Sequence, residues 1–239
     1  MKKVFQIFKW SVVVALLVVV LAFTNDRQQE QFLELNSINI ELSEDKFLTD
    51  EIIFGYINKQ NIQFDSVRFS KLLLEDLETT LQKHPAVKNV EVCSNQEGKI
   101  DVSLTQRKAV VRIKTNTTDF YLDEDGIEMP LSKHYTPRVL VVTGDVSPED
   151  YSSVYSFTNY INKIEFWNSQ ITQLHFINDE VVIIPRVGNQ KIHFGTLTNV
   201  KGKLENLYQF YKQAMPVKGW QTYTDISLRY NNQIVCTKK

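Results

Sequence analysis

Apolar residues form one long run near the start of the chain. Residues 10–23 read WSVVVALLVVVLAF without a charge, and the largely apolar residues 4–8 extend this run toward the N-terminus. About 20 residues of this kind can cross a hydrocarbon core of about 30 Å as a helix. The pattern therefore predicts a single transmembrane anchor at residues 4–24.

Basic residues stand on one side of this run. Lys2, Lys3 and Lys9 precede or enter it, and no acidic residue occurs before Asp26. The positive-inside rule keeps residues 1–9 in the cytoplasm and places everything after the anchor outside. The alternative is a cleaved signal peptide, since the uncharged run is short for a span. Both interpretations export the rest of the chain.

The next segment, residues 25–36, is polar and is typical of a tether. The pattern of residues 37–107 then predicts a small domain. It begins with a strand in which Ile38, Ile40 and Leu42 alternate with polar residues. Two helices follow. Thr49 can cap the first, and the second begins near Asp65 and ends at His84 because proline follows.

Two further alternating runs complete this domain. Val90 and Val92 mark one strand, and Ile100, Val102 and Leu104 mark the other, with the polar stretch SNQEG between them. The order strand, helix, helix, strand, strand indicates an α+β domain with both helices on one face of a three-stranded sheet.

Residues 108–239 predict a β-rich domain with two helices. Ser147 followed by Pro148 is a helix start with a capping residue. A second apolar stripe begins at Val200 and belongs to a helix that Pro216 closes. The remaining apolar runs are short and alternating, which favours strands.

The chain ends in a predicted hairpin. Ile226, Leu228 and Tyr230 alternate with polar residues, and Asn231-Asn232 can form a two-residue turn because asparagine tolerates positive φ. The final strand, residues 233–237, is short, and we expect it at a sheet edge.

Composition changes this picture little. Hydrophobic residues make up 43% and charged residues 23%, which is typical of a folded chain. The net charge of -1 disfavours nucleic acid as a partner, since such binding needs a basic surface. Cys93 and Cys236 fall in different predicted domains, so a disulfide between them and two separate thiols are both open.

Candidate chemistry is sparse. His84, His134, His175 and His193 lack zinc-site spacing and are expected to be surface or interface residues. The stretch from Asp123 to Gly126 fits a hairpin turn better than a calcium loop. We find no nucleophile elbow, phosphate loop or dinucleotide motif. The sequence therefore predicts no cofactor, no metal and no catalytic residue, and it indicates a binding module, although a scattered triad stays open.

Several stretches carry a resemblance to a known family. The segment from His84 to Val92 resembles the turn into the second strand of the POTRA domain (polypeptide-transport-associated) of FtsQ, called DivIB in Gram-positive bacteria. LTQRKAVVRI from Leu104 resembles the strand leading to that family's Glu-Arg-x-Pro-x-Ala signature, with Gln106 in place of Glu and Ala109 where Pro is common. FYLDEDGIEMP from Phe120 and the tail from Phe166 onward are similar to Bacteroidetes-type members.

The resemblance implies a non-enzymatic scaffold of the division machinery, anchored in the cytoplasmic membrane at the septum. Its expected partners are FtsB- and FtsL-like membrane proteins, with FtsB adding a strand to the last strand of the C-terminal domain. The residues that correspond to this contact are Tyr230, Asn231, Asn232, Gln233, Ile234, Val235 and Cys236. The alternatives are a POTRA-containing envelope protein of a translocation or outer-membrane assembly system, and an exported enzyme with an unrecognised site.

Overall fold

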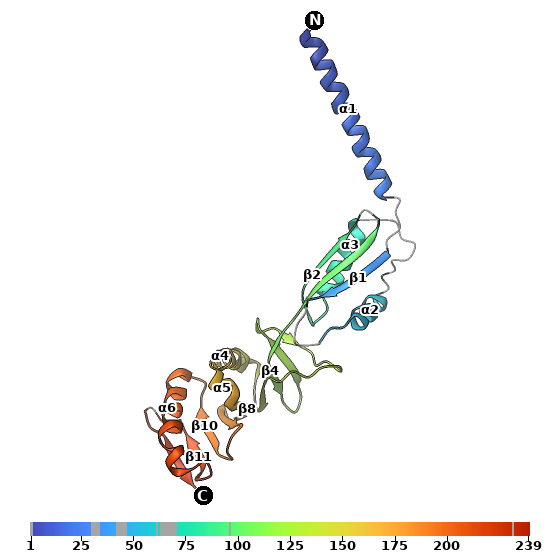
Figure 1. The fold of residues 1–239 in the computed structure, drawn as a ribbon. Coiled ribbons are helices and arrows are strands. Elements are labelled where there is room, and N and C mark those ends of the chain that lie inside the picture. Colours follow the sequence, from blue (N-terminus) through green and yellow to red (C-terminus); the bar gives the residue numbers. More distant parts are fainter. Residues whose placement is uncertain are drawn as a thin grey trace. The chain divides into compact units, whose positions relative to one another are not determined.

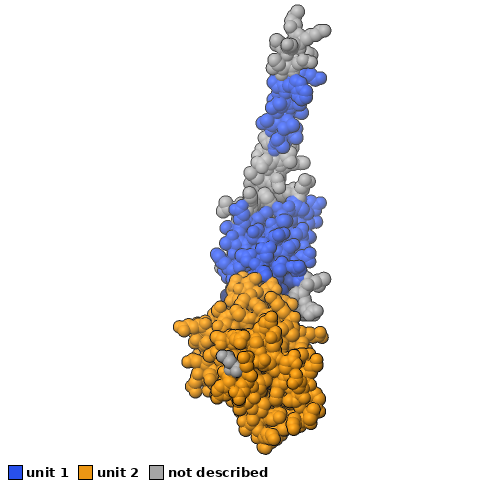
Figure 2. Space-filling view, turned by 90° about the vertical axis from the view of Figure 1, so that its left-hand side faces the viewer, with its two compact units in different colours: residues 1–106 blue, residues 107–239 orange. Residues whose placement is uncertain are grey.

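The computed structural model describes residues 2–29, 34–41, 47–60, 62, 71–95, 97–230 and 232–239. The chain divides into two units, Met1–Gln106 and Arg107–Lys239, which Figure 2 colours blue and orange. Each unit is described by itself.

The first unit begins with helix α1, Lys2–Gln29, whose described side chains from Phe8 to Leu21 are all exposed. The first residues of the predicted tether therefore belong to this helix. In the part of the chain that the structure describes, no helix reaches the length and apolarity needed to cross a membrane.

The α+β domain of this unit has the predicted element order (Figure 1). Its elements are β1 (Glu34–Ile40), α2 (Asp50–Lys59), α3 (Lys71–Gln82), β2 (Val87–Ser94) and β3 (Lys99–Gln106). Among the described residues the three strands form one sheet in the order β1-β3-β2, with β1 parallel and β2 antiparallel to β3. The predicted start of the second helix near Asp65 lies outside the described residues.

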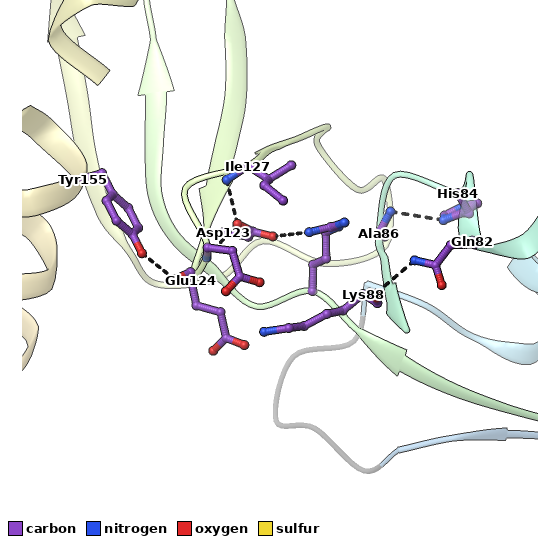
Figure 3. Close-up of polar contacts among 10 residues, drawn as sticks. Gln82, His84, Ala86, Lys88, Asp123, Glu124, Ile127 and Tyr155 are labelled. Carbon is purple, nitrogen blue, oxygen red and sulfur yellow. Dashed lines mark hydrogen bonds and ion pairs between the residues drawn. The ribbon is translucent and has the colours of Figure 1, made fainter. Parts of the chain in front are cut away.

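Local chemistry explains how these helices begin and end. Thr49 caps α2 as predicted, because its Oγ1 accepts a hydrogen bond from the Ile52 N–H at 3.4 Å. After α3, the Nδ1 atom of His84 accepts the Ala86 N–H at 3.2 Å (Figure 3). Burial lowers the pKa of His84, so this ring stays a neutral acceptor at lower pH than an exposed histidine.

The second unit is a mixed sheet with helices. Its described strands are β4 (Ala109–Lys114), β5 (Asp119–Asp123), β6 (Glu128–Met129), β7 (Leu140–Gly144), β8 (Ile171–Ile177), β9 (Glu180–Pro185), β10 (Lys191–Gly195), β11 (Tyr223–Ser227) and β12 (Val235–Lys238). They follow the order β12-β11-β10-β9-β8-β7-β4-β5-β6.

This unit contains more helix than the sequence predicted. The described helices are the 3-10 turn η1 (Pro148–Asp150), α4 (Tyr151–Asn162), α5 (Glu165–Gln170), α6 (Val200–Gln213) and α7 (Met215–Lys218). The prediction of two helices was wrong because it missed two short ones. Trp167 buries its side chain from α5, and Pro216 lies in the first turn of α7, where proline is tolerated.

The predicted start at Ser147 is confirmed. Its side chain and backbone N–H both bond to the Asp150 carboxylate, at 2.8 and 2.9 Å, and form a capping box before α4. Pro148 opens η1, which leads directly into α4. The buried face of α4 then packs into the core of the second unit.

The core of the second unit lies between the helices and one face of the sheet. Directly paired residues of neighbouring strands share a face, so the register defines a row across the sheet. We call this the apolar row: Ile113, Val142, Leu174, Ile183, Ile192, Ile226 and Cys236. All of these except Cys236 are fully buried, and α4 and α6 supply the opposing side chains.

Arg107, the first residue of this unit, forms an ion pair with Asp123, which precedes the turn between β5 and β6. Asp123 is fully buried, and its carboxylate pairs with Arg107 at 2.7 Å. The same side chain accepts the N–H groups of Asp125 and Ile127, at 2.9 and 2.8 Å (Figure 3). Asp123 to Gly126 therefore form the predicted turn, and no metal-binding group of three or more ligating side chains occurs among the described residues.

None of the four histidines is fully buried. His134 is exposed, and the other three are half-buried with hydrogen-bond partners; the sheet of the second unit places His175 beside Thr143 and His193 beside Asp225.

The terminal hairpin is wider than predicted, because β11 ends at Ser227 and β12 begins at Val235. Within this connection the Gln233 N–H donates to the Tyr230 carbonyl at 3.4 Å and Asn232 has a φ of 56°, which agrees with a turn at the predicted place. Leu228, at the start of the connection, is buried in the core.

Candidate partner-binding edge at the C-terminus

Strand β12 lies at one end of the nine-stranded sheet. It pairs with β11 in antiparallel register, with Ile226 opposite Cys236 and Ser227 opposite Val235. Among the described residues no strand pairs with its other side. The backbone groups on that side are therefore available to an added strand.

The register shows which residues present their backbone to the open side. The Lys239 N–H donates to the Thr222 carbonyl at 3.2 Å, so it points toward the interior of the sheet. Alternate residues of a strand direct their N–H groups to the same side. Thr237 and Val235 therefore also face β11, whereas Cys236 and Lys238 present their N–H groups to the open edge.

The helix-covered face of this edge is apolar. Cys236 ends the apolar row, and it and Ile234 pack partly buried against the core. Burial raises the pKa of the Cys236 thiol, so the side chain stays neutral and acts as a small apolar residue. An added strand would extend the apolar row by one position, next to Cys236.

The opposite face of this edge is more polar. Val235 is 41% exposed and shares a row with Ser227 and His193. The Nε2 atom of His193 lies 2.8 Å from Asp225 Oδ1, and this hydrogen bond holds the pKa of the Asp225 carboxyl below its ordinary value. The edge therefore has one apolar side and one side with a hydrogen-bonded anion.

The predicted contact residues fall in two places. Val235 and Cys236 lie in β12, whereas Tyr230, Asn232, Gln233 and Ile234 lie in the connection before it. Tyr230 is 59% exposed, and Asn232 has a φ of 56°. Asn231 lies outside the described residues.

Sequence reasoning placed the last strand at residues 233–237, whereas β12 runs from Val235 to Lys238. The predicted contact residues stopped at Cys236 and so left out Thr237 and Lys238, which are both exposed and can contact a partner. A signal existed, because Thr237 continues the alternation and lysine is a residue that commonly protects an open edge.

Both units of the chain match known protein families. The FtsQ/DivIB C-terminal related family matches residues 108–237, and a POTRA-like domain matches residues 28–105. The first match alone spans more than half of the chain. The chain belongs to the FtsQ/DivIB family.

Members of the FtsQ/DivIB family are membrane-anchored, non-enzymatic cell-division proteins with extracytoplasmic domains, and they act with other division proteins. A cell-division scaffold role is therefore supported for this chain. A solved structure with similarity is the major extracytoplasmic domain of the cell-division protein DivIB from Geobacillus stearothermophilus, trans isomer. It is 13% identical, with a TM-score of 0.34, and the match covers 46% of this chain and 96% of that one. No curated protein sequence matches the chain.

The chain departs from the family signature at Gln106 and Ala109. Gln106 stands where the signature has Glu, and its buried Oε1 accepts the Leu48 N–H at 3.2 Å. A neutral amide serves this backbone donor without a buried charge. The following Arg107 has its own carboxylate, Asp123, so the departure at position 106 leaves the arginine paired.

Proposed function

We propose that this FtsQ/DivIB-family chain is held in the cytoplasmic membrane by residues 4–24, with residues 1–9 in the cytoplasm, and acts outside it at the division septum. There it recruits FtsB- and FtsL-like proteins, and the FtsB-like partner adds a strand to β12. The observation that carries the proposal is the open edge, at which Cys236 and Lys238 direct their N–H groups away from β11.

The side chains of the edge also indicate which kind of partner segment would fit it. A strand beside β12 needs an apolar side chain opposite Cys236, where it continues the apolar row toward the core. Side chains opposite Val235 and Thr237 lie on the other face and are free to be polar. The partner segment is therefore expected to alternate between apolar and polar residues.

Lys238→Pro tests strand addition. Proline removes an N–H that faces the open edge and leaves the bonds to β11 in place, because prolines are tolerated at strand edges in this orientation. We expect the full-length, detergent-solubilised chain to keep its thermal midpoint but capture FtsB-like protein from membranes about tenfold less well.

Two variants control for other causes. Lys238→Ala removes the same side chain but keeps the N–H, so capture should be retained. Thr237→Pro removes an N–H that faces β11 and should lower the thermal midpoint. Undiminished capture by Lys238→Pro would show that the partner does not use this edge.

The cellular role has its own test. Depletion of the chain should produce filamentous cells, and a fluorescent fusion should concentrate at the septum. Normal septation after depletion would contradict the division role, whatever the binding experiments show.

A further inference from the structure

Strand β1 of the first unit has an open side. Among the described residues β1 pairs only with β3, so no strand lies along its other side (Figure 1). The Glu41 N–H donates to the Leu104 carbonyl at 2.8 Å and therefore points toward β3. Because alternate residues of a strand direct their backbone groups to the same side, Ile38 and Ile40 present theirs to the open side.

This edge has few of the features that protect an open strand, which are lysine, proline and bulges. At the opposite edge of the same sheet, β2 begins with a bulge at Lys88 and follows Pro85. Strand β1 contains neither lysine nor proline, and its own bulge lies before Ser37. From Ser37 to Ile40 it therefore offers a regular edge to an added strand.

One face of the sheet beside this edge is apolar. Ile38 and Ile40 are half-buried, and their partners in the register, Val102 and Leu104, are fully buried. Apolar side chains of an added strand, opposite the two isoleucines, would cover the parts of them that are exposed.

The other face forms an open polar groove of about 650 Å³. Its polar lining side chains are Asn39, Glu41, Asn89, Glu91, Ser103 and Thr105. Asp101, two residues before Ser103 on β3, lies on the same face. Among the described residues no lysine or arginine forms an ion pair with Glu41 or Glu91, and Lys99, the basic residue of β3, is paired with Glu97 at 3.1 Å.

Neutral groups hold these carboxylates in place. Thr105 Oγ1 donates to Glu41 Oε2 at 2.9 Å. Asp101 Oδ1 accepts from Ser37 Oγ at 2.6 Å and from Asn36 Nδ2 at 2.8 Å, and these hydrogen bonds hold the pKa of the Asp101 carboxyl below its ordinary value. The groove therefore keeps its negative charge at neutral pH, which repels an acidic segment and favours a basic one.

From this geometry we infer that β1 accepts an added strand from a partner whose segment alternates between apolar and basic residues. Its apolar side chains lie opposite Ile38 and Ile40, and a basic side chain lies opposite Glu41, the carboxylate next to the open side. A second copy of the chain does not fit this description, because β1 itself contains no basic residue. The inference concerns the first unit and does not depend on strand addition at β12.

Three labelled peptides test the inference on the full-length chain in an uncharged detergent. They share the pattern Thr-X-Val-X-Val-X-Thr, with Lys, Gln or Glu at every X, and fluorescence anisotropy measures their binding. We expect affinity to fall in the order Lys, Gln, Glu, with roughly fivefold tighter binding of the Lys peptide than of the Gln peptide. High salt should reduce this difference, because it screens exposed charges.

Variants of the chain locate the bound peptide. Ile40→Pro removes an N–H on the open side and should weaken binding of the Lys peptide about tenfold, whereas Ile40→Ala keeps the N–H and should retain most of it. Glu41→Gln should reduce the preference for Lys over Gln to about twofold or less. Glu78→Gln removes the same charge from α3 and is the matched control, which should keep the full preference.

A further variant separates this edge from the one in the second unit. Lys238→Pro acts at β12 and should leave binding of the Lys peptide unchanged. Undiminished binding to Ile40→Pro, or binding that only Lys238→Pro abolishes, would overturn the inference. Equal affinity for the three peptides, or no binding of the Lys peptide at millimolar concentration, would overturn it as well.

Discussion

At the scale of a single residue, the side chain of Asp123 makes several polar contacts inside the second unit. Its Oδ2 accepts from Arg107, and its Oδ1 accepts two backbone N–H groups of the β5–β6 turn. A buried carboxylate is tolerated when it is paired and hydrogen-bonded in this way. Removing it leaves a mostly buried guanidinium without an anion.

Asp123→Ala is therefore expected to lower the free energy of unfolding of the second unit by about 3–5 kcal/mol. Urea unfolding followed by tryptophan fluorescence measures it, since Trp167 and Trp220 both lie in this unit. The double variant Asp123→Ala, Arg107→Met should recover part of the loss, because no unpaired charge remains. A loss below about 1 kcal/mol in the single variant would contradict this account.

The buried residue Tyr211 leads us to expect that the stability of the second unit falls at high pH. Burial raises its pKa to about 12 from the ordinary value of 10.0. The folded state holds this proton more tightly than the unfolded state, so the contribution to stability is full below pH 10 and is lost as the pH rises toward 12.

A shift of this size corresponds to about 2–3 kcal/mol between the two states. We expect the free energy of unfolding of the natural chain to fall between pH 10 and 12, and that of Tyr211→Phe to fall less steeply. Urea unfolding at stepped pH measures both slopes. Parallel slopes would show that other groups cause the alkaline loss.

At the scale of elements, the end of β7 depends on glycine. Gly144 has a φ of 90°, and a Cβ atom there would overlap the Phe176 carbonyl oxygen of the neighbouring strand β8. Gly126, in the β5–β6 turn, has a similar φ of 76° but only the ring of Tyr155 nearby, at 3.7 Å. Substitutions at these two glycines therefore distinguish the cost of a positive φ from the added cost of steric overlap.

Gly126→Ala should cost about 1–2 kcal/mol of unfolding free energy, the cost of positive φ alone. Gly144→Ala should cost at least about 3 kcal/mol, because the β7–β8 pair must also move apart. Thermal or urea unfolding of the two variants makes the comparison. Equal losses would mean that the sheet yields to the added carbon without penalty.

At the scale of the whole molecule, the proposed function needs the chain to stay on a membrane. The side chains from Phe8 to Leu21 in α1 are exposed and almost all apolar, and a lipid environment would cover them. The proposed anchor also raises the local concentration of β12 near other anchored chains, so modest affinity at the edge can suffice.

Leu17→Arg tests this proposal. A charge at the centre of a span is costly, by about 2.5–3.5 kcal/mol on insertion scales. We expect the natural chain to remain in the membrane pellet after alkaline carbonate extraction, and the variant to be released in part. A control variant, Leu17→Ala, should stay in the pellet. Full release of the natural chain would contradict the anchor and favour a cleaved leader.

Local patterns predicted much of the element structure, and particular residues show why. The cap at Thr49 and the start at Ser147 depend on neighbours three residues away, so sequence alone reveals them. The length of the connection before β12 could not be predicted locally, because Leu228 is buried in the core by partners far along the chain. The acceptor of Arg107 could not be predicted either, since strand register and packing bring Asp123 to it.

The sequence by itself determined the apolar run at the start, the order strand, helix, helix, strand, strand, and the position of the last strand, because these follow from periodicity over a few residues. Only the tertiary structure decided that β12 ends the nine-stranded sheet of the described residues and that the N–H groups of Cys236 and Lys238 face its open side. Those features depend on pairing between distant segments, which the free energy of the whole fold selects.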